Sequence, residues 1–155
     1  MDVGLIVLDH RLLPEEPLPD ATLAVIELPL SADQRTVLRG CRRTACGRDV
    51  LLQLPRERAL APGDRLTNSL RQVHVLVTAA PEELLRVEAA TPLALLEAAY
   101  HLGNRHVALE LHEHELLLLN ASVLAAMLNG RGLKLTRCCG PFRPEGGAYL
   151  AHQHA

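Results

Sequence analysis

The order of periodicities between residues 83 and 137 constrains the fold of this chain most. Alternating or wholly apolar short runs predict strands, and a run with apolar residues at helical spacing predicts a helix. These patterns follow one another as β-α-β-β-α-β, which is the ferredoxin-like arrangement of a two-layer α+β sandwich. The predicted elements are a strand over 83–89, a helix over 93–102, two strands within 106–119, a helix over 122–130 and a last strand over 133–137.

The boundaries of the two predicted helices carry recognisable capping residues. Thr91–Pro92 offers an N-cap followed by proline at the first helical position, and Gly103–Asn104 predicts where that helix stops. Asn120 or Ser122 is the candidate cap of the second helix, which Asn129–Gly130 should end. The predicted helix stop at Gly103–Asn104 therefore has one histidine on each side, His101 before it and His106 after it.

Residues 1–77 show a different pattern, that of an all-β domain. Short alternating or apolar runs over 22–30, 49–55 and 73–79 predict strands, and none of the segments between them has the length of a good helix. The Arg-rich stretch 39–49 is predicted to be a loop or a ragged edge. We therefore expect a small β-barrel or sandwich over 1–77, the ferredoxin-like domain over 78–140, and a Gly/Pro-rich tail over 141–155 that bears histidines.

Composition excludes several classes of function. The net charge of -2, the single Phe, the two Tyr and the absence of Trp argue against nucleic-acid binding. No apolar run approaches the roughly 18 residues of a membrane helix, and the acidic start does not fit a secretory signal, so we expect a cytoplasmic protein without a membrane partner. Reduced thiols without a metal role are then the favoured interpretation of the four cysteines, Cys41, Cys46, Cys138 and Cys139.

Two histidines flank the predicted helix stop. His101 falls in the last turn of the first helix, where an imidazolium complements the helix dipole, so structural packing and a ligand role both remain open. His106 follows the reversal, and its side chain is placed to project from the edge of the domain. It is the stronger of the two candidates for a metal ligand.

Two further pairs have His-x-His spacing. In a strand, His112 and His114 would point to one face and reach one metal ion, whereas at a hairpin turn they would be solvated turn residues. His152 and His154 have the same spacing in the tail, as a weak capture arm or as part of a polar tail.

Motifs of catalysis are missing from this sequence. It contains no Walker loop, dinucleotide fingerprint, nucleophile elbow or H-E-x-x-H zinc motif, so no catalytic residue is predicted. A catalytic metal site usually combines about three protein ligands with one open position. Histidines in separate short clusters suit a protein that holds and releases a metal better than an enzyme.

Several motifs, in order along the chain, resemble those of the UreE family of urease accessory proteins. The central one, "YHLGNRH" at 100–106, resembles the family signature, and the others extend the resemblance over most of the chain. They are "LPLSADQR" (28–35), "LLQLPRERALAPGDRL" (51–66), "AAPEELLRV" (79–87) and "PFRPEGGAY" (141–149).

The resemblance implies a nickel metallochaperone of urease maturation and not an enzyme. It implies an N-terminal β domain that binds a peptide or partner protein, and a ferredoxin-like domain through which the protein forms a homodimer. His106 and its mate would hold Ni(II) at the two-fold axis, and Zn(II) or Cu(II) would compete for the same nitrogen ligands. Expected partners are the accessory GTPase UreG and the complex of urease apoprotein with its accessory proteins.

The sequence departs from the family pattern in two places. An auxiliary His pair of some relatives falls at Asn120 and Ser122 here, and the long His-rich tail of many relatives is reduced to His152 and His154. We therefore expect one interfacial site completed by the tail, with His101 as a packing residue or an accessory ligand. The alternative is a scaffold of the urease accessory complex in which metal only stabilises the dimer.

Overall fold

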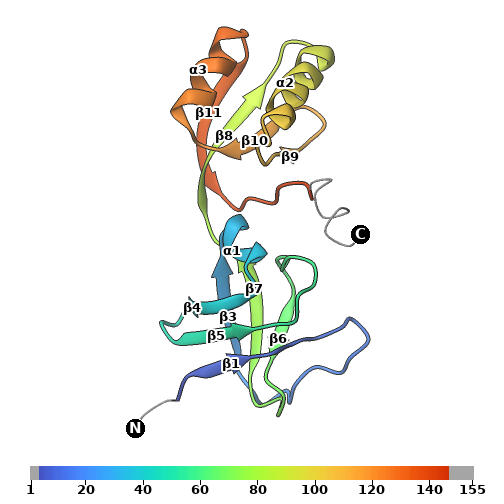
Figure 1. The fold of residues 1–155 in the computed structure, drawn as a ribbon, viewed down its shortest axis with the longest axis vertical. Helices are drawn as coiled ribbons and strands as arrows, with labels where there is room; N and C mark the ends of the chain where they lie inside the picture. The colour runs from blue at the N-terminus through green and yellow to red at the C-terminus, as the bar shows by residue number, and fades with distance from the viewer. Residues whose placement is uncertain (1–3, 147–155) are drawn as a thin grey trace. The chain divides into compact units, whose positions relative to one another are not determined.

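The computed structural model describes residues 4–146 and contains both helices and several sheets. The chain divides into two compact units, Met1–Ala79 and Ala80–Ala155 (Figure 1). Within the described residues, no helix is long and apolar enough to cross a membrane.

The first unit packs two sheets around one apolar core. Leu8, Val50 and Leu52 from one sheet and Leu28 and Val75 from the other belong to the same buried cluster, which explains why these strands alternate between apolar and polar residues. The three-stranded sheet has the order β1 (Ile6–Leu8), β5 (Asp49–Gln53), β4 (Arg39–Arg43). The four-stranded sheet has the order β2 (His10–Arg11), β6 (Arg65–Thr67), β7 (His74–Ala79), β3 (Val25–Leu30).

One prediction for this unit is wrong, and another holds only in part, since the predicted loop or ragged edge is a regular edge strand followed by a turn. A short helix, α1 (Ala32–Thr36), lies in the region predicted to be wholly β, and it starts with a capping box between Ser31 and Gln34. The Arg-rich stretch contains the regular edge strand β4, which pairs with β5 from Arg39 to Arg43. The sequence does not reveal this strand because its side chains lack the alternation of apolar and polar residues that marks a half-buried strand. It forms because its backbone pairs with β5.

The second unit has the element order β-α-β-β-α-β, and all of its strand pairs are antiparallel. The sheet order is β11-β8-β10-β9. The elements are β8 (Glu82–Glu88), α2 (Pro92–Asn104), β9 (Glu110–Leu111), β10 (Leu116–Leu119), α3 (Ser122–Gly130) and β11 (Lys134–Gly140). Both helices cover one face of the sheet (Figure 1), since one buried cluster joins Leu95, Ala98 and Leu102 of α2 and Leu128 of α3 to β8 and β10.

The helix starts agree with the sequence in one case only. Thr91 is the N-cap of α2, and its hydroxyl oxygen accepts a hydrogen bond from the Ala94 N–H, as predicted. The predicted cap of the second helix is wrong: Ala121 is the N-cap of α3, without a side-chain hydrogen bond, and Ser122 is already helical. The burial of Leu128 in the core holds this helix without a side-chain cap.

Candidate metal centre

His106 occupies the left-handed position of the turn that ends α2. Its φ is +59°, and its N–H donates to the carbonyl of Gly103 at 3.0 Å, while the Val107 N–H donates to the carbonyl of Leu102 at 3.1 Å. These two hydrogen bonds define a Schellman motif, in which the left-handed residue is usually glycine. Gly103 and Asn104, the predicted stop, are themselves helical, and the chain reverses at His106.

The end of α3 repeats the same turn with glycine at the matching position. Gly132 has φ +75°, its N–H donates to the carbonyl of Asn129 at 3.0 Å, and the Leu133 N–H donates to that of Leu128 at 3.3 Å. The two segments align without a gap, "LGNRHV" (102–107) against "LNGRGL" (128–133). One domain thus places Gly in one copy of the motif and His in the other, although a Cβ in the left-handed region costs about 1–2 kcal/mol. Arg71, at φ +57°, is another residue other than glycine in this region, so the conformation of His106 gives a hypothesis of function for the imidazole and not its demonstration.

The turn is exposed, and the helix that leads to it carries an exposed apolar row. His106 is exposed, and His101 is half-buried on α2 with its ring edge-on to Tyr100, the ring centres 5.4 Å apart. Leu93, Leu96 and Tyr100 of α2 expose 64%, 68% and 69% of their surfaces. Residues at this spacing lie on one side of a helix, so α2 presents an apolar stripe to solvent as well as a buried face.

His112 and His114 lie in the turn between β9 and β10 and have different partners. Nε2 of His112 lies 2.9 Å from Oε1 of Glu110, whereas Nε2 of the highly exposed His114 lies 3.7 Å from Oε1 of Glu113. His152 and His154 lie outside the described residues. Between residues 4 and 146, no three His, Cys, Asp or Glu side chains gather as a metal-binding group.

The cysteines are free thiols. Cys41, Cys46 and Cys139 are exposed, and Cys138 is half-buried. Hydrogen bonding to the Thr44 hydroxyl is the main cause that lowers the pKa of Cys46, with the backbone and the charge of Arg48 adding to it.

Cys46 also lines a groove of about 630 Å³ along β3, together with Val25, Glu27 and Arg48. β3 is an edge strand of its sheet. The lining of this groove therefore contains both apolar and charged side chains.

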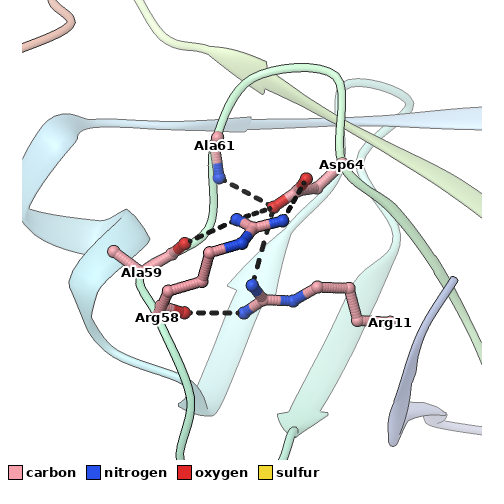
Figure 2. Close-up of polar contacts among 5 residues, drawn as sticks. All are labelled: Arg11, Arg58, Ala59, Ala61 and Asp64. Carbon is pink, nitrogen blue, oxygen red and sulfur yellow. Dashed lines mark hydrogen bonds and ion pairs between the residues drawn. The ribbon is translucent and has the colours of Figure 1, made fainter. Parts of the chain in front are cut away.

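A cluster of charges anchors the loop before β6 in the first unit (Figure 2). Arg58 donates two hydrogen bonds to the carboxylate of Asp64, at 2.9 and 3.1 Å, and the Ala61 N–H donates another at 2.9 Å. The buried Arg11 donates to the Arg58 carbonyl at 2.9 Å and lies 3.8 Å from Asp64. Burial alone would raise the pKa of Asp64, but the hydrogen bonds from Arg58 and Ala61 and both positive charges lower it. Two guanidinium groups on one carboxylate stabilise the loop and are unsuited to holding a cation.

Comparison with known proteins identifies the class to which this arrangement belongs. The family model described as "UreE urease accessory protein, C-terminal domain" matches residues 82–155, the part that contains the His106 turn. Proteins named urease accessory protein UreE match all or most of the chain. The one from Synechococcus sp. (strain CC9311) is 85% identical over 100% of both chains, and the one from Parasynechococcus marenigrum (strain WH8102) is 60% identical over 99% of both. A third, from Thermosynechococcus vestitus, is 47% identical over 88% of this chain and 94% of its own.

The chain therefore belongs to the UreE family of urease accessory proteins. The shared name describes accessory proteins and not the urease enzyme itself.

Proposed function

We propose that this protein is a cytoplasmic nickel metallochaperone that takes part in urease maturation. It binds Ni(II) as cargo between the His106 imidazoles of two identical subunits and passes the ion on. The family membership supports the role in maturation. The proposed acceptors are the accessory GTPase UreG and the complex of urease apoprotein with its accessory proteins.

The observation that carries this proposal is the left-handed conformation of His106. A residue in the usual place of glycine presents its side chain beyond the end of α2, on an exposed corner. A single imidazole binds a metal weakly, so a corner ligand of this kind needs a second copy or another donor. A symmetric pair supplies two nitrogen ligands and leaves further positions open for an acceptor.

The apolar stripe of α2 supports the homodimer. Leu93, Leu96 and Tyr100 form an exposed row on the helix that leads to His106, and a row of this kind is typical of an interface. A two-fold axis that passes the C-terminal end of this helix would bring the two His106 side chains together. The element order and the sheet order β11-β8-β10-β9 support a ferredoxin-like assignment for the domain that carries the site.

The remaining ligands of the site come from outside the described residues or from the acceptor. His152 and His154 are candidates to complete the coordination of the interfacial ion. Zn(II) and Cu(II) would compete, since both accept imidazole nitrogen and Cu(II) binds such ligands more tightly than Ni(II).

A transfer assay separates this proposal from the scaffold alternative. Nickel-loaded protein is mixed with purified UreG, the two are separated by size exclusion, and the nickel in each fraction is measured. The wild type should transfer nickel, while His106→Gly should remain a dimer and transfer almost none. Equal transfer by both proteins would contradict the assignment of His106.

The scaffold alternative rests on the groove along β3 in the first unit. An exposed sheet edge with an apolar lining and Arg48 beside it fits an extended peptide with acidic side chains. If the protein is a scaffold, His106→Gly should leave its affinity for the partner unchanged. Metal would then affect only the monomer–dimer equilibrium.

A further inference from the structure

A hollow in the first unit lies between β1 and the turn that joins β6 to β7. Its volume is about 380 Å³, at the low end of the range for ligand pockets, which suits a single side chain or another small group. Of the described residues that line it, Asp9 is the only one that ionises. The apolar part of the lining comes from both sides and includes Leu5, Val7, Leu70 and Val73.

The two carboxylate oxygens of Asp9 have different surroundings. Oδ2 accepts a hydrogen bond from the Ser69 hydroxyl at 2.9 Å. Oδ1 is buried and has no hydrogen-bond partner among the described residues. A buried carboxylate oxygen without a donor costs free energy, and a ligand that brings a positively charged N–H donor to Asp9 would remove this cost.

The single unpartnered oxygen favours an ammonium group over a guanidinium group. A guanidinium binds a carboxylate best through two parallel hydrogen bonds, one to each oxygen, but Ser69 already donates to Oδ2. An ammonium is a compact point charge and needs one acceptor only. The apolar side chains of Val7, Leu70 and Val73 fit the alkyl stem that would carry the ammonium.

Two leucines of the lining favour a partner protein over a free amine as the ligand. Leu5 exposes 54% of its surface and Leu70 exposes 74%. A small amine would leave both leucines in water, whereas the residues on either side of a partner's lysine would cover them. Exposed apolar side chains beside a polar pocket are typical of an interaction site.

The turn on one side of the hollow is held in place without a ligand. Arg71 follows Leu70 and has φ +57°, and its N–H donates to the Asn68 carbonyl at 2.9 Å. Its guanidinium donates to the Pro17 carbonyl and lies 3.7 Å from Glu16, which offsets its charge. A wall that is already ordered loses little conformational entropy when a ligand binds.

We infer that this hollow docks a lysine side chain of a partner protein, with the ammonium on Oδ1 of Asp9 and the stem against Val7 and Leu70. The inference goes beyond the proposed function, because it concerns the first unit and requires no metal. The groove along β3 shares Gln72 and Val73 with the hollow, but Asp9 belongs to the hollow alone.

An NMR titration of the metal-free, full-length protein with the blocked tripeptide acetyl-Leu-Lys-Leu-amide tests this inference. The amide signals of Ser69 and Leu70 report whether the hollow is occupied. We expect saturable binding that weakens at least tenfold when norleucine, which lacks the ammonium, replaces the lysine. Asp9→Asn should cause a similar loss, and the matched control Asp33→Asn, at an exposed carboxylate of the same unit, should cause none.

Two further ligands test the choice of group and its source. The tripeptide with arginine in place of lysine should bind more weakly, and n-butylammonium alone should bind at least tenfold more weakly than the lysine tripeptide. Arginine binding as tightly as lysine would overturn the choice of an ammonium. Equally tight binding of n-butylammonium would overturn the partner protein in favour of a free amine.

The site itself is overturned by any of three results. These are no saturable binding of the lysine tripeptide, equal binding of the norleucine tripeptide, or full binding by Asp9→Asn. The norleucine comparison uses the wild-type protein, so it stands even if Asp9→Asn fails to fold. Since metal is absent throughout, these results leave the proposed role of His106 to its own test.

Discussion

Replacing His106 with glycine should stabilise the second unit of the metal-free protein while removing its metal site. The φ of +59° carries a penalty of about 1–2 kcal/mol for any residue with a Cβ. Glycine avoids this penalty but makes the unfolded chain more flexible, which costs about 0.5–1 kcal/mol. With the middle value of each range, the net gain is about 0.75 kcal/mol, which corresponds to a rise of about 3–6 °C in Tm for a unit of this size.

Gly132 provides the matched control in the other copy of the motif. It has φ +75°, and a Cβ added there would have no heavy atom within 4 Å, so Gly132→Ala measures the backbone penalty without a steric clash. We expect Gly132→Ala to lower the stability of the same unit by about 0.75 kcal/mol, because the reduced flexibility of the unfolded chain offsets part of the backbone penalty.

Thermal unfolding in a chelating buffer, followed by circular dichroism, measures both variants. The expected result is a higher Tm for His106→Gly and a lower Tm for Gly132→Ala. A lower Tm for His106→Gly, together with intact structure, would refute the reasoning, because the imidazole would then contribute more to stability than its backbone conformation costs.

Three further predictions test other parts of the structure. Leu96→Glu places a charge in the exposed stripe of α2 and should convert the dimer to a monomer in light scattering, with its circular dichroism spectrum unchanged. Asp64→Asn leaves the buried Arg11 without its counter-charge and should lower the free energy of unfolding of the first unit by about 3 kcal/mol in urea titration. Burial, with the nearby Arg65 charge, lowers the pKa of His74 below its usual 6.5, so the neutral ring is favoured in the folded state. Stability should therefore be full above about pH 6.5 and fall as the pH drops below it.

Each of these predictions has a control and a contradicting result. Val123→Glu on α3 should leave the dimer intact, and a dimer that persists in Leu96→Glu would exclude the stripe as the interface. The control Asp20→Asn, on an exposed loop, should change the free energy of unfolding little. A change for Asp64→Asn as small as that of the control would show that the Arg11 cluster does not stabilise the unit. His74→Gln should flatten the pH dependence, and an unchanged slope would assign it to other groups.

The parts of the fold that depend on local chemistry were predictable from the sequence. Thr91–Pro92 marks the start of α2 because a hydroxyl cap and a proline act within one turn. The order of elements in the second half follows from periodicities that both helices and strands express strongly.

Other parts depend on partners that are distant in the sequence. β4 is a strand because it pairs with β5, and its Arg-rich sequence alone does not show this. The five-residue helix α1 is too short for a periodic signal, although its Ser31–Gln34 capping box was readable.

His106 as the metal ligand stays a prediction, and its backbone conformation was not predictable from the local sequence pattern. The Gly103–Asn104 pair predicts a helix stop at those two residues, but both are helical, and His106 takes the left-handed position. Alignment of residues 102–107 with 128–133 carries that signal, since it places His106 opposite Gly132.

Nickel calorimetry on the wild type and on His106→Gly, with the mass of each followed by light scattering, decides whether two chains share one ion at His106. We expect one tight ion per two chains in the wild type, and a variant that is still a dimer but lacks that tight site. One tight ion in every chain, bound equally well after His106→Gly, would contradict a shared site at the two-fold axis.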